Sequence, residues 1–193
     1  PVEPQPASVS SETSAPLNTT YRRNIRFEQF GLEEGLSQSV VNVIIQDRVG
    51  FLWIGTQDGL NRYDGYNFKI YKPDPDNPNS LSDRWITALA EDPQGYLWVG
   101  TRLGGLNRYD PVSGKFKRYM NNLTDSQSLG SNQVTSLQAD TRGIWVGTEY
   151  GLDFFDYQTE TFTHHRSSSE DPSSLSSNLV SALFKDSQGM LWV

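Results

Sequence analysis

Four tryptophans stand at nearly even intervals along this chain, and their spacing limits the fold more than any other feature of the sequence. Successive members of the set are 45, 47 and 47 residues apart, and each lies in a near-copy of one segment. A self-similar period of this length is typical of stacked supersecondary units, because a single unit cannot bury its apolar face alone. The four positions are Trp53, Trp98, Trp145 and Trp192.

Each copy contains four short runs with apolar residues, separated by residues that favour turns. An Asp-x-x-Gly turn leads into the tryptophan run, which ends in Gly-Thr, and further glycine-containing turns lead to a third and a fourth run. Asp is favoured at the first position of a tight turn and Gly at the last. Four strands joined by three tight turns predict an antiparallel meander, and a meander repeated at this period predicts a β-propeller blade.

We therefore predict an all-β propeller with three complete blades, an N-terminal outer strand and a truncated fourth blade, which together make a partial ring. Residues 25–30 repeat the aromatic spacing of a fourth strand without the first three strands, as the strand that closes a ring would. The predicted divisions are a flexible lead-in at 1–22, the orphan outer strand at 23–35, blades at 36–80, 81–128 and 129–174, and the start of a fourth blade at 175–193.

The partial ring predicts that apolar blade faces stay open unless the remaining blades of a larger ring, or a second copy of the chain, cover them. A complete ring of this kind would hold six to eight blades. The first strand of the last three units carries a small residue, Ala88, Ser136 or Ala182, that suits the crowded centre of the ring, and the first unit has Val43 at this position. The residues just before these positions are polar and are expected near the axial channel: Asn42, Thr87, Thr135 and Ser181.

The unit resembles the repeat of the two-component regulator propeller family. The resemblance rests on Leu-Ser, then Asp-x-x-Gly-x-Leu-Trp-Ile/Val-Gly-Thr, then Gly-Leu-x-x-Tyr/Phe-Asp, then Phe-x-x-Tyr, and it covers residues 25–193. It implies a periplasmic ligand-sensing region placed before a transmembrane helix and a histidine kinase, a hybrid two-component system or a diguanylate cyclase. The third unit departs from the pattern, because it lacks the leucine before Trp145 and has Phe154-Phe155 in place of Arg-Tyr.

Composition narrows the range of partners. The net charge of −7 argues against a nucleic-acid backbone or an anionic membrane and favours a neutral or cationic ligand. No run approaches the roughly 18 to 20 apolar residues that span a bilayer, so we expect no direct membrane insertion by this segment. The chain has no cysteine and therefore no thiolate metal site.

Motifs that would carry catalysis, a cofactor or a metal are not found. The adjacent His164 and His165 lie on a predicted outer strand, and a structural role is the better interpretation. The glycines between Gly100 and Gly105 lack the Gly-Lys-Ser/Thr of a phosphate loop, and residues 74–79 lack the glycine and terminal glutamate of a calcium loop. We expect no catalytic residue, no metal and no cofactor in this segment.

The candidate ligand site comes from positions at which the units differ. In a propeller, the turns between second and third strands share one face with the connections between blades. Positions that only maintain the fold should repeat, so divergence on this face suggests a site for a small molecule or an oligosaccharide, although tolerance in loops would look the same. Trp85 with Arg84 and Asn132 could stack on and hydrogen-bond a sugar-like ligand. The candidate residues are Arg84, Trp85, Asn132, Gln133, Asn178, Arg102, Glu149 and Tyr150.

Three functions remain open at this point. The first is the periplasmic sensor, in which ligand occupancy shifts a signalling equilibrium across the membrane. The second is a stand-alone exported binding or scaffold propeller with a carbohydrate-like ligand. The third is a propeller enzyme, which would need clustered acids or histidines at the axial channel, and the four units do not show them.

Overall fold

A computed structural model describes residues 29–193 of the chain. This part is all-β, with three four-stranded antiparallel sheets and one two-stranded hairpin. No helix within residues 29–193 is long and apolar enough to cross a membrane. The predicted lead-in at 1–22 and the predicted strand at 25–28 lie outside the described residues.

Each sheet is a meander whose strand order follows the chain. The first sheet contains β1 (Val41–Gln46), β2 (Leu52–Thr56), β3 (Gly59–Tyr63) and β4 (Phe68–Tyr71). The second contains β5 (Ile86–Glu91), β6 (Leu97–Thr101), β7 (Leu106–Asp110) and β8 (Lys115–Tyr119). The third contains β9 (Val134–Ala139), β10 (Gly143–Thr148), β11 (Gly151–Asp156) and β12 (Phe162–His165), and the hairpin pairs β13 (Phe184–Lys185) with β14 (Leu191–Trp192).

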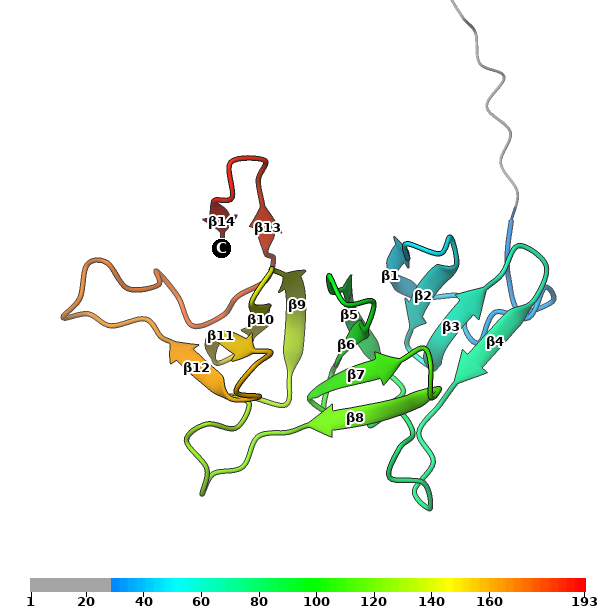
Figure 1. Cartoon of the computed structure of the whole chain (residues 1–193), viewed down its shortest axis with the longest axis horizontal. Helices are drawn as coiled ribbons and strands as arrows, with labels where there is room; N and C mark the ends of the chain where they lie inside the picture. The colour runs from blue at the N-terminus through cyan, green and yellow to red at the C-terminus, as the bar shows by residue number, and fades with distance from the viewer. Residues whose placement is uncertain (1–28) are drawn as a thin grey trace, which may run out of the picture.

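The three sheets are arranged as neighbouring blades of an open arc (Figure 1). Their first strands, β1, β5 and β9, lie toward the centre and contact one another in sequence, while β4, β8 and β12 lie outermost. The β13–β14 hairpin continues the arc beyond the third sheet. The arrangement confirms the predicted β-propeller architecture with an incomplete ring.

A bulge in each inner strand aims a polar side chain at the next blade. The register shifts between Val41 and Val43 in β1 and at the matching places in β5 and β9. The extra residues are Asn42, Thr87 and Thr135. Asn42 and Thr87 donate to backbone carbonyls of the next inner strand, as Thr87 Oγ1 does to Val134 O at 2.6 Å, and Thr135 donates to Val180 O in the fourth unit. Bulges commonly re-aim a side chain in this way, and here they link neighbouring blades around the channel.

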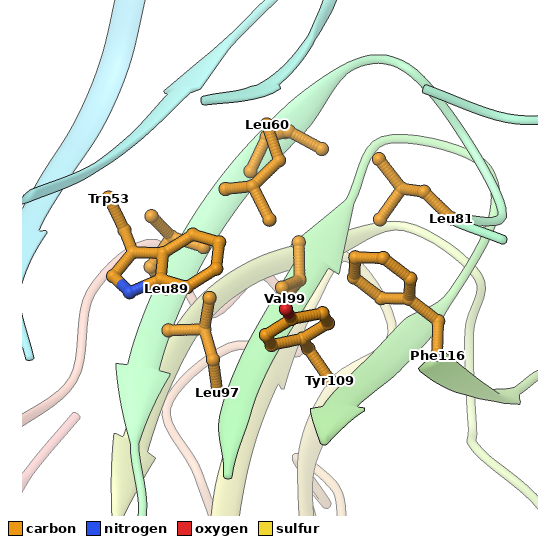
Figure 2. Packing of buried hydrophobic residues seen from close by; sticks show 9 residues of the cluster. Trp53, Leu60, Leu81, Leu89, Leu97, Val99, Tyr109 and Phe116 are labelled. Carbon is orange, nitrogen blue, oxygen red and sulfur yellow. The ribbon is translucent and has the colours of Figure 1, made fainter. Parts of the chain in front are cut away.

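Tryptophan and its aromatic neighbours fill the space between the first and second blades (Figure 2). Trp53 is 2% exposed, and its ring lies 5.7 Å from that of Tyr71 and 5.3 Å from that of Tyr109. The two tyrosine hydroxyls are 3.0 Å apart. Burial, reinforced by the hydrogen bond with Tyr71, raises the pKa of Tyr109 to about 12. Leu60, Leu81, Leu97 and Phe116 complete this layer.

The same layer recurs between the second and third blades around Trp98, which is fully buried. Its ring stacks on Tyr119 at 5.7 Å and on Tyr157 at 5.8 Å, and it meets Phe155 at 5.2 Å. The strands approach closely here because Gly100 has no side chain. A Cβ at that position would lie 2.5 Å from Val134 Cγ1 in the next inner strand.

An aspartate in each Asp-x-x-Gly turn holds the turn and also the tryptophan that follows. The Oδ1 atom of Asp92 accepts from turn amides, and its Oδ2 atom accepts from Trp98 Nε1 at 2.7 Å. Asp47 with Trp53 and Asp186 with Trp192 repeat this arrangement. The third unit is one residue shorter here, so Asp140 instead pairs with Lys185 Nζ at 2.7 Å, and Trp145 packs on Phe154.

Two segments differ from the expected strands. Of the predicted orphan outer strand, residues 29–31 have no regular structure and residues 32–35 form a turn, and Phe30 packs on Tyr63 at 5.0 Å. In the fourth unit, residues 180–183 are not a strand although the apolar pattern predicts one. In the complete blades the matching residues pair with the Gly-Thr end of the second strand, and β14 offers no such partner.

Candidate functional site

The face formed by the turns between second and third strands and by the connections between blades carries two neighbouring cavities. We call it the mouth face, because it surrounds the inner strands on one side of the ring. The seam cavity, about 320 Å³, lies where the second and third blades meet. It is lined by Trp85, Thr87 and Arg102 of the second blade and by Gln133, Val134, Thr135 and Glu149 of the third.

The second cavity, which we call the loop cavity, lies farther out and has a volume of about 460 Å³. It shares Gln133 and Glu149 with the seam cavity, so these two side chains form the wall between them. Leu123 and Tyr150 give this cavity exposed apolar surface. Its lining residues are Asn121, Leu123, Gly130, Ser131, Asn132, Gln133, Glu149 and Tyr150.

Backbone hydrogen bonds hold the turns of the mouth face against the connections between blades. Arg102 N donates to Trp85 O at 3.0 Å, and Glu149 N donates to Gln133 O at 3.3 Å. Asp83 joins the two loops of the second blade, because its carboxylate accepts from the amides of both Trp85 and Leu103. The backbone around the seam cavity is therefore held in place by the blade itself.

The threonine of each Gly-Thr pair shapes the turn that follows it. Thr148 Oγ1 donates to Gly151 O at 2.9 Å and accepts from the amide of Tyr150 at 3.0 Å. Thr56 and Thr101 donate to Gly59 and Gly105 in the same way. The repeat therefore supplies a threonine hydrogen bond at each turn, although the turn of the second blade is one residue longer, and the side chains at the tip differ between blades.

Arg102 and Trp85 form a stacked pair at one side of the seam cavity. The guanidinium carbon of Arg102 lies 4.1 Å from the centre of the Trp85 ring. A cation at this distance is attracted by the negative face of the indole. The stack covers that face of Trp85 and leaves the guanidinium N–H groups free to meet a ligand.

Gln133 and Glu149 form a polar pair at the other side of the seam cavity. With its amide nitrogen facing the carboxylate, Gln133 donates to Glu149, at 2.8 Å from Oε1. Glu149 is exposed and Gln133 half-buried. The carboxylate retains further lone pairs and can accept from hydroxyl or ammonium groups.

Six of the eight predicted residues line these cavities, and two do not. Arg84 is exposed, and its carbonyl accepts from Gly59 N. Asn178 Oδ1 accepts from the amide of Ser167, and Asn132 Oδ1 accepts from Asn121 N, both at 2.8 Å. Because these two asparagines make the same bond, their amide oxygens are occupied in shaping the connections between blades.

Sequence reasoning did not include Thr87, Thr135 and Leu123 among the candidates. The polar alternation of the inner strands placed the two threonines near the channel, and that signal could have added them. Leu123 is 95% exposed in the connection between blades, and no pattern in the sequence singled it out. The predicted arrangement of Trp85, Arg84 and Asn132 around a sugar is not assembled, since Arg102 stacks on Trp85 instead.

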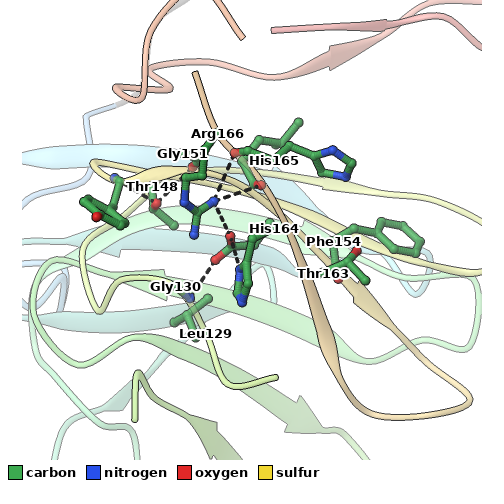
Figure 3. A network of polar contacts seen from close by, with 12 residues as sticks. Leu129, Gly130, Thr148, Gly151, Phe154, Thr163, His164, His165 and Arg166 are labelled. Carbon is green, nitrogen blue, oxygen red and sulfur yellow. Dashed lines mark hydrogen bonds and ion pairs between the residues drawn. The ribbon is translucent and has the colours of Figure 1, made fainter. Parts of the chain in front are cut away.

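A separate polar network lies in the third blade around His164 and Arg166 (Figure 3). The side chain of Asp153 in this network is fully buried. Its carboxylate accepts from Arg166 Nη1 at 2.8 Å and from Gly130 N at 2.7 Å, and it lies 2.7 Å from His164 Nδ1. His164 Nε2 lies 3.0 Å from Ser126 O in the preceding connection. The network therefore ties the third blade to the connection that supplies Asn132 and Gln133 to the mouth face.

The remaining oxygen-rich loop has a structural explanation. Ser80 Oγ accepts from the amide of Asp74 and donates to its carbonyl, which closes residues 74–80 into a compact loop. Ser128 and Ser174 close the matching loops in the next two units. Within residues 29–193, no group of three or more His, Cys, Asp or Glu side chains could hold a metal ion.

Comparison with known families identifies the repeat that is observed in the structure. The sequence profile of the two component regulator propeller matches residues 35–58, 80–102, 128–150 and 174–193. The first three matches begin in the residues before β1, β5 and β9, and all four cover an Asp-x-x-Gly turn and the tryptophan strand. The chain belongs to the two-component regulator propeller family. All eight predicted site residues lie within the matched segments of this propeller.

Solved structures and a curated relative agree with the family. The propeller is similar to the extracellular domain of a protein assigned as the hybrid two component system BT3049 from B. thetaiotaomicron, with a TM-score of 0.75 and 32% identity over 85% of this chain and 23% of that one. For BT4673 of the same organism the TM-score is 0.70, with 25% identity over 84% of this chain and 21% of that one. Histidine kinase P4 from Formosa agariphila is 51% identical over 59 residues, which are 31% of this chain and 4% of the relative. The propeller thus spans less than a quarter of each of these proteins.

Proposed function

We propose that this propeller is part of the periplasmic ligand-sensing region of a transmembrane bacterial signalling receptor. Its family and its likeness to extracellular domains of two-component systems support this proposal. The match to a histidine kinase favours a kinase as the output, with a diguanylate cyclase as the alternative. The propeller itself acts by binding rather than by catalysis, and its ligand is a small molecule or an oligosaccharide.

The position of the seam cavity is the observation that carries the proposal. Its two walls belong to different blades, with Arg102 on one and Glu149 on the other. A ligand that touches both walls stabilises one placement of the blades relative to each other. A ligand shifts an equilibrium only by its differential affinity for the two states, and a site between two blades offers such a difference. The third blade then transmits this change in blade placement to the parts of the receptor that contact it.

Binding at the seam should be measurable as thermal stabilisation of the chain. We expect at least one compound in a panel of mono- and oligosaccharides, amino acids and sugar acids to raise the melting temperature. At about 100 times its dissociation constant, a ligand adds about 2.7 kcal/mol, which corresponds to roughly 5 to 10 °C for a chain of this size. Glu149→Ala should reduce the shift, because it removes the acceptor wall of the cavity.

Val112→Ala is the matched control. Val112 is 94% exposed in the turn between the third and fourth strands, on the face opposite the mouth. The control variant should therefore keep the full thermal shift. The proposal would be contradicted if no compound stabilises the chain, or if Glu149→Ala and Val112→Ala respond to the active compound in the same way as the unaltered chain.

A further inference from the structure

Arg102 differs from the arginines that link neighbouring parts of the propeller. Arg48 pairs with Glu91 at 2.7 Å, Arg118 donates to Ser80 O at 2.9 Å, and Arg166 pairs with Asp153. Within residues 29–193, the Arg102 guanidinium forms no hydrogen bond and no ion pair, and it stacks on Trp85. Trp85 nevertheless holds this group at the wall of the seam cavity, so Arg102 is positioned without being neutralised.

The two walls of the seam cavity therefore differ in charge and in hydrogen-bonding character. The Arg102 guanidinium offers the cavity only donors, whereas the Glu149 carboxylate on the other wall offers only acceptors. The hydroxyl protons of Thr87 and Thr135 are donated to the carbonyls of Val134 and Val180, so these two hydroxyls can offer a ligand only acceptors. A complementary ligand would place acceptors at Arg102 and donors at Glu149.

We propose that the seam cavity recognises a small carboxylate whose other end carries hydroxyl or ammonium groups. This inference rests on the proposed sensing function and specifies its ligand. A planar guanidinium fork matches a carboxylate through two parallel hydrogen bonds. The volume of about 320 Å³ suits a small molecule. Amino acids and sugar acids share this chemistry.

The net charge of −7 by itself favours a neutral or cationic ligand. Interactions between exposed charges fade beyond a Debye length of about 8 Å at physiological ionic strength. Ligand binding in the seam cavity is therefore governed by the groups that line the cavity. Arg102 is the cationic group among them. Glu149 disfavours a carboxylate at its own end, which sets the direction in which the ligand binds.

Two pairs of probes separate the carboxylate from the rest of the ligand. L-serine is compared with L-serinamide, and glucuronate with glucose, so each pair differs mainly in the carboxylate. Binding is measured by calorimetry and by the indole N–H signal of Trp85. We expect one of the two acids to bind and its neutral counterpart to bind at least 10-fold more weakly, and the acid that binds identifies the ligand class.

Variants of Arg102 test the residue itself. Arg102→Gln should weaken the binding acid by about 10- to 150-fold, the range for losing a hydrogen bond to a charged group. Arg102→Lys should rescue part of that loss, since a point charge replaces the fork. Arg84→Gln, next to Trp85 but outside the cavity, should leave binding unchanged.

The outcomes separate this inference from the proposed function. If glucose or serinamide binds as tightly as its acid, or if Arg102→Gln binds the acid normally, the carboxylate inference is wrong. A neutral compound that still depends on Glu149 would leave the sensing function intact. If none of the four probes binds, the inference is also overturned, while the wider panel decides the sensing function.

Discussion

Replacing Trp98 with alanine should cost about 3 to 5 kcal/mol of stability, the range for removing a buried tryptophan. Trp98 is fully buried between the second and third blades and packs on Tyr119, Phe155 and Tyr157. The cavity left behind would lie at the joint of two sheets, where backbone hydrogen bonds resist collapse. Urea unfolding, followed by circular dichroism, measures the loss.

Trp192→Ala provides the matched control within the same repeat. Trp192 also donates its Nε1 proton to an aspartate, Asp186, at 2.9 Å, but its side chain is 61% exposed. Its replacement should cost less than about 1 kcal/mol, because little apolar surface is uncovered. Equal losses for the two variants would show that the hydrogen bond, rather than the packing between blades, explains the repeated tryptophan.

Removing the buried carboxylate of the third blade should have the second large effect. Asp153→Ala leaves Arg166 without its anionic partner and Gly130 N without its acceptor. Breaking a buried pair from one side costs on the order of 3 kcal/mol. The loss should be concentrated in the third blade and in the connection held through His164, and amide hydrogen exchange would locate it there.

Asp153→Asn is the informative companion variant. The first two blades carry Asn61 and Asn107 at the matching position, where the amide oxygen accepts from Ser37 N and Ser82 N. The introduced amide oxygen could accept from Gly130 N in the same way, so this variant should lose only about 1 kcal/mol. Asp58→Ala removes an exposed pair with Lys72 and should cost less than about 1 kcal/mol. If Asp153→Ala is as mild as Asp58→Ala, the network does not stabilise the blade.

The repeat made the fold predictable, because turn residues and apolar runs recur in every unit. Asp92 and Gly95 mark a turn by local chemistry alone, and Trp98 marks the layer that it fills. Departures from the repeat were not predictable in the same way. Glu160 adopts a φ of 54° where the second blade has Gly114, and its carboxylate meets Lys117 of the neighbouring blade at 2.5 Å. That contact depends on the placement of two sheets.

The face of the propeller that carries the site was predictable from the sequence. The arrangement of the side chains on that face was not. Differences between the units pointed to Trp85, Arg102, Gln133 and Glu149, and the structure gathers these four around one cavity. The stacking of Arg102 on Trp85 joins two loops of one blade and depends on side-chain conformation. The third unit has Asp153 where the first two units have Asn61 and Asn107. The role of Asp153 emerged only with Arg166 and Gly130 beside it.

The five indole N–H signals of this chain test the central claim most directly. They are assigned from single Trp→Phe variants and followed during titration with a compound that binds. If the mouth face is the ligand site and the repeated tryptophans maintain the fold, the Trp85 signal shifts with saturation. The signals of Trp53 and Trp98, which are hydrogen-bonded to Asp47 and Asp92, stay in place. A shift of Trp145 or Trp192 with an unchanged Trp85 would place the ligand elsewhere and contradict the account.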